Sequence, residues 1–209
     1  MIVGITGATG FVFGIRALEV LRQMGIETHL VVSRAAEMTR AYETGMSREQ
    51  LHALADHVHP INDVGASISS GSFRTMGMLI APCSVRTLAE VASGVTTTLL
   101  TRAADVVLKE RRKLVMMVRE APLHAGHIRN MLTVTELGGI IHPPVPAFYT
   151  HPQTIEDIVD HSLGRALDCF GLEMPDMLRW SGPELRREAV GDRRLEVPSG
   201  TQDRTYAIP

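Results

Sequence analysis

The first 24 residues predict a strand, a glycine-containing loop and a helix in direct succession. Met1 to Ile5 is short and apolar, and apolar residues recur at helical spacing from Phe11 to Met24. The connecting loop contains Gly7-Ala8-Thr9-Gly10. A short strand that leads directly into an amphipathic helix is the repeating unit of α/β folds, so this segment limits the fold class more than any other.

The same alternation of strands and helices continues along the chain. Further strands are predicted at 28–32, 76–81, 113–118 and 140–141, helices at 35–42, 47–55, 87–92, 99–110, 127–137 and 154–170, and weak structure at 58–66. Continuously apolar strands between helices are typical of a parallel sheet covered on both faces. We therefore expect a doubly wound α/β fold of Rossmann or flavodoxin type, with three αβα layers.

Length and composition favour one folded domain. The chain has 209 residues, of which 44% are hydrophobic, and this suits a single well-filled core. From residue 183 onward the sequence is charged, interrupted by proline and glycine, and poor in apolar residues. We expect residues 1–182 to form the domain and residues 183–209 to form a surface arm, partly disordered.

Charge and targeting signals exclude several classes of protein. The net charge of −2 gives no electrostatic footprint for nucleic acid or an anionic membrane. No apolar run approaches the ~20 residues of a membrane span, and no basic leader precedes the first strand. Cys83 and Cys169 match no zinc or redox spacing, so we expect a cytoplasmic protein with reduced thiols.

The nine histidines do not predict a metal site. His57-Val58-His59 and the pair His124 and His127 are the closest approaches to a ligand pattern. Neither has a carboxylate or cysteine partner at a fitting sequence spacing. We expect no bound metal.

Parallel sheets bind ligands at the carboxyl ends of their strands. The first loop follows a strand and opens a helix, so its amides can face an anion. Its spacing matches neither a dinucleotide fingerprint nor a P-loop. The second strand ends at Ser33-Arg34, where a nicotinamide-binding domain usually has an acid. This favours a phosphate ligand, and the alternative is that the glycines serve only tight strand–helix packing.

Two later strand ends carry polar side chains. Ser84, in Pro82-Cys83-Ser84, is either a ligand contact or a simple helix N-cap. Arg119-Glu120 offers a cation and a proton carrier, or else forms a mutual ion pair. Cys83 is interpreted as a small buried residue.

One cation stands in the last predicted helix. Its buried stripe is predicted to comprise Ile155, Ile158, Val159, Ser162, Ala166 and Phe170. Arg165 falls at the edge of this stripe, where it either extends to solvent or reaches a buried anion.

Taken together, these segments resemble the UbiX/Pad family of flavin prenyltransferases over residues 1–182. The motifs are Gly-Ala-Thr-Gly at 7–10, Ser-Arg-Ala-Ala at 33–36 with Glu43, Ser-Ser-Gly-Ser-Phe-Arg at 69–74, Pro-Cys-Ser at 82–84, the run 102–112, Arg-Glu-Ala-Pro-Leu at 119–123, Pro-Pro-Val-Pro-Ala-Phe-Tyr at 143–149 and Arg-Trp at 179–180. At Phe11, where many members have a small residue, the added bulk is expected to reshape the site.

The resemblance implies a reaction and a set of partners. Members join a dimethylallyl group from dimethylallyl phosphate to N5 and C6 of reduced FMN, without a metal. The product, prenylated FMN, serves UbiD-type decarboxylases. Members assemble as homo-oligomers, commonly dodecamers, with sites between subunits.

The resemblance also implies roles for individual residues. FMN would be contacted by Gly7, Ala8, Thr9, Ser33, Ser84, Val85, Arg86, Thr87 and Arg119, and the prenyl phosphate would be held by Lys109, Arg119, Tyr149 and Arg165. Glu43 and Glu120 would transfer protons, and Trp180 would place a π face beside the prenyl cation. Cations and a phenol suit the developing charge of a phosphate leaving group.

Two other functions remain open from the sequence. One is a flavin-dependent decarboxylase that acts directly, although the histidine and Asn-rich motif of cysteine decarboxylases is not found. The other is an FMN-binding accessory subunit that delivers a cofactor without catalysis.

Overall fold

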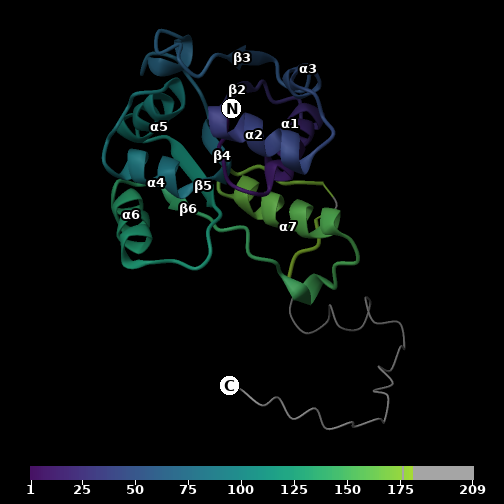
Figure 1. The fold of residues 1–209 in the computed structure, drawn as a ribbon. Helices are drawn as coiled ribbons and strands as arrows, with labels where there is room; N and C mark the ends of the chain where they lie inside the picture. The colour runs from purple at the N-terminus through teal and green to yellow at the C-terminus, as the bar shows by residue number, and fades with distance from the viewer. Residues whose placement is uncertain (176, 181–209) are drawn as a thin grey trace, which may run out of the picture.

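The computed structural model describes residues 1–175 and 177–180, and Figure 1 shows a sheet with helices on both sides. The six strands are β1 (Ile2–Ile5), β2 (His29–Val32), β3 (His57–His59), β4 (Gly77–Cys83), β5 (Lys113–Val118) and β6 (Ile140–Ile141). Their order is β3-β2-β1-β4-β5-β6, and every neighbouring pair is parallel. This confirms the doubly wound α/β fold that the sequence predicts.

The described residues also form seven α-helices and two short 3-10 helices, between the strands and after the last one. They are α1 (Phe11–Gln23), α2 (Arg34–Glu43), α3 (Arg48–His52), η1 (Ser67–Ser69), α4 (Val85–Ala92), α5 (Leu99–Lys109), α6 (Ala125–Glu136), η2 (Phe148–Thr150) and α7 (Ile155–Asp168). Helices α1 and α7 share one apolar cluster, and α4, α5 and α6 share another. In Figure 1 these two groups lie on opposite sides of the strands, which gives three layers.

Alternation along the strands builds the two apolar clusters. Leu79 of β4 faces the cluster with α1 and α7, whereas Met78 and Ile80 face the cluster with α4, α5 and α6. This is the period of two that a strand imposes on its side chains. Gly14 lets α1 pack tightly, because a Cβ there would lie 2.5 Å from Ile5 Cδ1 and 2.7 Å from the Ala81 carbonyl oxygen.

Three local expectations change in the structure. Residues 57–59 form β3, which the sequence did not reveal because His57 and Val58 are exposed on an edge strand. Ile155 was predicted to be buried and is 73% exposed, since the buried side of α7 starts at Val159. Phe11 is fully buried in the apolar cluster with α1, so its bulk fills the core and does not line a ligand site.

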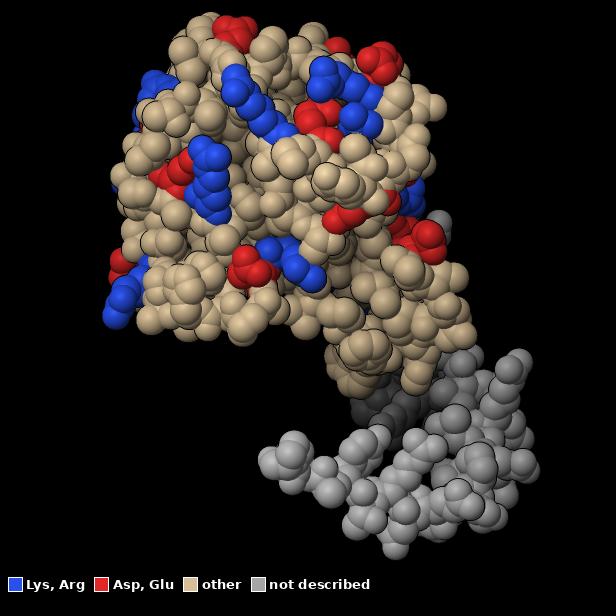
Figure 2. All heavy atoms as spheres, viewed as in Figure 1, with Lys and Arg blue, Asp and Glu red and all other residues tan. Residues whose placement is uncertain are grey.

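Surface charge is mixed rather than of one sign. Figure 2 shows basic and acidic side chains interspersed on the face in view. Among the residues that the structure describes, no helix has the length and apolarity needed to cross a bilayer. The predicted arm at 183–209 lies outside the described residues.

Candidate active site

A cavity of about 320 Å³ opens at the carboxyl ends of β1, β2 and β4. It lies where the strand order reverses, since the chain runs from β1 outward to β3 and then returns to place β4 on the other side of β1. Doubly wound sheets bind their ligands at this position. The lining residues are Gly7, Ser33, Arg34, Ala35, Ile61, Asn62, Ser84, Arg86, Thr87, Glu90, Thr98, Leu100 and Thr101.

Three helices begin at the wall of this cavity. Ser33 caps α2 by accepting from the Ala36 amide at 3.1 Å, and Ser84 caps α4 by accepting from the Thr87 amide at 3.3 Å. Thr98 caps α5 in the same way. Helix N-termini carry free amides and partial positive charge, so together they favour an anion such as a phosphate. Ser84 is therefore an N-cap and a lining residue at once.

Thr6 fixes the two central strand ends to each other. Its hydroxyl donates to the Pro82 carbonyl oxygen at 2.9 Å and accepts from the Ser84 amide at 2.7 Å. The residue is only 1% exposed. A buried hydroxyl with both bonds made holds the end of β1 and the start of α4 in one geometry.

The first loop contributes to the cavity in a different way from that expected. Gly7 lines it, and a Cβ at Gly7 would lie 2.3 Å from Ala35 Cβ, so the glycine is needed where the loop meets α2. The N-terminus of α1, however, already has an anion. Glu43 Oε2 accepts from the amides of Gly10 at 2.9 Å and Phe11 at 2.8 Å. The helix N-termini that face the cavity are those of α2, α4 and α5, whereas the N-terminus of α1 is capped by Glu43.

Some predicted flavin contacts lie near this cavity without lining it. Three of them do not line the cavity: Ala8 and Thr9, which follow the lining residue Gly7, and Val85, which lies between the lining residues Ser84 and Arg86. Arg86 lines the cavity and pairs with Glu90 (2.9 Å).

Arg119 and Glu120 follow β5 at the same edge of the sheet. The Arg119 amide donates to the Cys83 carbonyl oxygen at 3.0 Å, which places Arg119 beside the end of β4. The two side chains form no ion pair with each other in the described part of the chain. Instead, Glu120 Oε1 accepts from the Ala121 amide at 3.0 Å. Arg119 itself is exposed and does not line the cavity.

A second polar cluster surrounds α7 and η2, and we call it the α7 cluster: Tyr149, His161, Arg165, Asp168, Arg179 and Trp180. Tyr149 Oη lies 3.0 Å from His161 Nε2, and the Tyr149 ring meets Trp180 edge-on at 5.5 Å between centroids. The α7 cluster thus contains three residues of the predicted prenyl site: Tyr149, Arg165 and Trp180.

Ion pairs organise the other half of the α7 cluster. Asp168 accepts from Arg165 at 2.7 Å and from Arg179 at 2.7 and 2.9 Å. The hydrogen bond from Arg179, with Arg165 contributing less, holds the pKa of Asp168 below its usual value. Burial, with Arg165 next, lowers the pKa of His161. Arg165 is thus held by a neighbouring carboxylate and does not simply extend into solvent.

Lys109 stands apart from both groups. Thr101 of α5 lines the cavity, and Lys109 ends the same helix about 12 Å farther along its axis. There Lys109 pairs with Glu110, at the end of the helix that leads into the start of β5. Within one chain it does not reach the cavity.

Several lining residues were missed from the sequence. Asn62 lies just beyond the end of β3, and a strand-end search would have found it had that strand been recognised. Thr98 carried a helix-start signal but followed no strand. Cys83 is fully buried, and burial raises the pKa of its thiol, which agrees with its interpretation as a packing residue.

Comparison with known proteins decides the family. Residues 1–167 match the family model described as Flavoprotein. The flavin prenyltransferase UbiX of Neisseria meningitidis is 60% identical over 182 residues, which cover 87% of this chain and 96% of that protein. The chain belongs to the UbiX flavin prenyltransferases. The predicted resemblance is confirmed.

Solved structures of UbiX proteins agree in fold. The crystal structure of AnUbiX (PadA1) in complex with FMN and dimethylallyl pyrophosphate superimposes with a TM-score of 0.86 at 53% identity, covering 87% of this chain and 96% of that one. A dodecameric FMN-dependent UbiX-like decarboxylase from Escherichia coli O157:H7 gives a TM-score of 0.85 at 52% identity, covering 87% and 98%. Both share the chain's sheet and helix arrangement over nearly their whole length.

Proposed function

We propose that this chain, a flavin prenyltransferase, joins the dimethylallyl group of dimethylallyl phosphate to N5 and C6 of reduced FMN. The observation that carries the proposal is the cavity at the strand-order reversal, where the N-termini of α2, α4 and α5 meet in a chain 60% identical to a UbiX protein. This arrangement fits a flavin phosphate.

The cavity walls suit binding of FMN as a substrate. Ser33, Ser84 and Thr87 offer hydroxyls beside free helix amides, and Arg86 adds a cation at the rim. A dianionic phosphate gains from both. Gly7 keeps the first loop close enough to α2 for the loop backbone to contact the ligand. When bound, FMN supplies the two nucleophilic atoms that receive the prenyl group.

The α7 cluster and Arg119 suit the prenyl phosphate. Cleavage of the allylic C–O bond leaves an electron pair on the phosphate, where Arg119, Arg165 and the Tyr149 phenol can stabilise the charge. Trp180, 5.5 Å from the Tyr149 ring, offers its face to the allylic cation. Bond formation releases protons from N5 and C6, while the prenyl double bond and the phosphate each take one up. Glu120 and Glu43 are the carboxylates proposed for these transfers.

Lys109 requires a second copy of the chain. Its position at the far end of α5 prevents it from meeting Arg119 within one subunit. We propose that the chain forms a homo-oligomer in which Lys109 of one copy completes the prenyl-phosphate site of another. The dodecameric relative supports this arrangement. The proposed recipient of the product is a UbiD-type decarboxylase, and residues 1–182 are the proposed catalytic domain.

The test is anaerobic incubation of the full chain with reduced FMN and dimethylallyl phosphate, followed by mass spectrometry of the released flavin. We expect the flavin mass to rise by one C5 unit. Glu120→Gln should abolish most of the gain and retain FMN binding, whereas Arg129→Ala, an exposed arginine on α6, should have no effect. Bound FMN of unchanged mass would contradict the proposal.

The same preparation separates the two alternatives. Release of carbon dioxide from an aromatic acid by the purified chain alone would indicate direct decarboxylation. Full delivery of a cofactor to a decarboxylase by Glu120→Gln would indicate an accessory carrier. The proposed transferase gives neither result.

A further inference from the structure

Four polar residues gather where β2 begins and along the short edge strand β3. We call Glu27, His29, His57 and His59 the His29 cluster. In the parallel register His29 lies beside His57, and Val31 lies beside His59. The three histidines therefore project from one face of neighbouring strands, and Glu27 reaches them from the turn before β2. None of them takes part in the proposed prenyl transfer.

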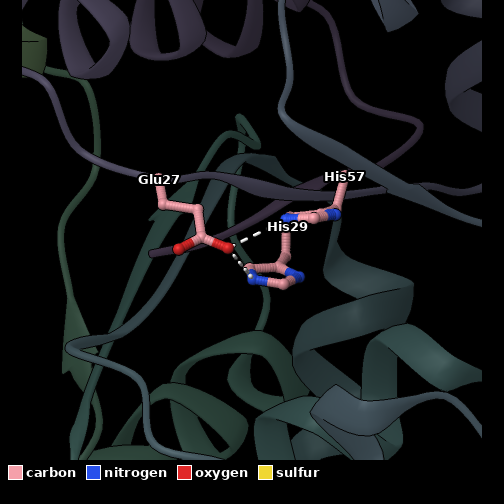
Figure 3. Close-up of side chains that lie close together, drawn as sticks. All are labelled: Glu27, His29 and His57. Atoms are coloured by element: carbon pink, nitrogen blue, oxygen red, sulfur yellow. Dashed lines mark hydrogen bonds and ion pairs between the residues drawn. The ribbon is translucent and has the colours of Figure 1, made fainter.

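Three ligand atoms converge in this cluster, as Figure 3 shows. Glu27 Oε1 lies 2.8 Å from His57 Nε2 and 3.6 Å from His29 Nε2. All three atoms lie within 4.8 Å of one another. Two ligand atoms that each lie 2.0–2.2 Å from a tetrahedral zinc ion are roughly 3.3 Å apart. The two distances from Glu27 Oε1, 2.8 and 3.6 Å, lie on either side of this value.

The environment of His29 points to a ligand more than to a simple ion pair. Its side chain is 8% exposed, and its Nε2 faces the Glu27 carboxylate at 3.6 Å, which is too long for a hydrogen bond. A cation between this buried nitrogen and the carboxylate would give both groups a partner.

The other ring nitrogen of His29 has the partner that a metal ligand needs. His29 Nδ1 lies 3.0 Å from His59 Nε2, and Phe73 packs edge-on against the ring at 5.1 Å. A bond from the Nδ1 proton to His59 leaves the Nε2 lone pair free and fixes the direction of the ring. Metal-binding histidines are almost always oriented by such an outer partner.

We propose that Glu27, His29 and His57 bind one Zn²⁺ ion, with His59 as the partner that orients His29. Glu27 and His57 side chains are 68% and 51% exposed, so a water molecule can complete the tetrahedron. The exposed His57 ring, now stacked on His29 at 4.6 Å, is free to turn its lone pair toward the ion. The ion would clip edge strand β3 to β2.

The site is independent of the catalytic proposal. His29 and His57 are the first residues of their strands, whereas the cavity lies beyond the last residues. The four residues of β2 separate the zinc ligands from the cavity by roughly 10 Å, and His59 at the end of β3 does not line the cavity. Zinc binding can therefore be measured without prenyl transfer, and failure of either proposal leaves the other standing.

The test is calorimetric titration of the full, untagged chain with ZnCl2. We expect one saturable site per chain. Glu27→Gln and His57→Gln should each weaken zinc binding at least tenfold, and His52→Gln, which changes a histidine outside the cluster, should not. His59→Ala should weaken binding 10- to 100-fold. His59→Gln should restore part of that loss, because its amide oxygen accepts the same bond from His29.

Folding is checked by circular dichroism and FMN binding, which all five variants should retain. Wild-type protein without a saturable site, or zinc binding unchanged in both Glu27→Gln and His57→Gln, would overturn the proposal. If a variant fails to fold, zinc-dependent protection of His29 and His57 from histidine-specific modification in the wild-type chain decides the question, and equal modification with and without zinc counts against the site.

Discussion

The cavity and the α7 cluster are built on different principles. At the cavity, polar groups are helix caps and backbone amides, such as those around Ser33 and Ser84, which the fold holds in place. In the α7 cluster, the polar groups are long side chains that pair with one another, and Arg165 and Trp180 are 55% and 58% exposed. The first site is preorganised within one chain, whereas we expect the second to become ordered only when its ligand binds.

The ion pairs of the α7 cluster show how it can respond to an anion. Asp168 holds both Arg165 and Arg179. An entering phosphate must compete with that carboxylate for Arg165, and Arg179 then remains to neutralise Asp168. We expect a flavin phosphate at the cavity to need such an exchange only at Arg86, which pairs with Glu90, because the helix amides there have no carboxylate partner among the bonds of the described residues. The two sites should therefore respond differently to substitution.

Arg165→Ala gives the largest expected separation between the sites. Loss of a cation that stabilises the departing phosphate should lower kcat/KM for prenyl transfer about 100- to 1000-fold. The Kd for FMN should stay within twofold of wild type, because Arg165 does not line the cavity. Steady-state kinetics and flavin fluorescence titration measure the two quantities. An equal loss in kcat/KM and in FMN affinity would show that the cavity and the α7 cluster do not act as separate sites.

Gly7→Ala should have the opposite pattern. The new Cβ would lie 2.3 Å from Ala35 Cβ, so the first loop and α2 must separate. A cost of about 2 kcal/mol corresponds to FMN binding weakened about 30-fold. Gly45→Ala is the matched control, since nothing lies within 4 Å of its Cβ. Unchanged FMN affinity would show that the loop does not form a wall of the flavin site.

His161→Ala should have a moderate effect on the α7 cluster alone. It removes the 3.0 Å partner of Tyr149 Oη, and a net hydrogen bond of about 1 kcal/mol predicts a roughly fivefold higher KM for the prenyl phosphate. His161→Gln can keep a partner for the phenol and should recover most of the loss. If the glutamine variant behaves like alanine, the histidine acts through packing and not through Tyr149.

Acid should weaken the α7 cluster slightly and leave the cavity unaffected. The pKa of Asp168 is lowered by Arg179, so its contribution to stability is present above about pH 4 and is lost as pH falls through the lowered value. The side chains of its partners are exposed, so the effect should be under about 1 kcal/mol. Melting temperatures between pH 3 and 6 should depend less on pH in Asp168→Asn than in wild type. Glu136→Gln, an exposed carboxylate on α6, should match wild type.

Strands with a strong apolar pattern could be predicted from the sequence, whereas the edge strand β3 and the exposed first turn of α7 could not. The strands β1, β2, β4 and β5 were all predicted, because burial on both faces leaves almost only apolar residues between their first residues and their ends. The edge strand β3 carries His57 and His59 and gives no such signal. In α7, helical spacing alone placed Ile155 in the core, yet the first turn of the helix extends past the apolar cluster, which begins at Val159.

The site was predictable to the same extent. That Ser33, Ser84 and Arg119 lie at the same edge of the sheet follows from the sequence pattern alone, since parallel strands place all their carboxyl ends together. Which helix N-termini stay free for an anion became clear from the packed fold. Glu43, at the end of α2, caps α1, and the N-termini of α2, α4 and α5 face the cavity. The contact between Glu27 and His57 likewise depends on the pairing of β2 with β3, which brings together residues far apart in the sequence. Local pattern encodes backbone conformation and burial, whereas a contact between distant side chains exists only once the segments that carry them have packed.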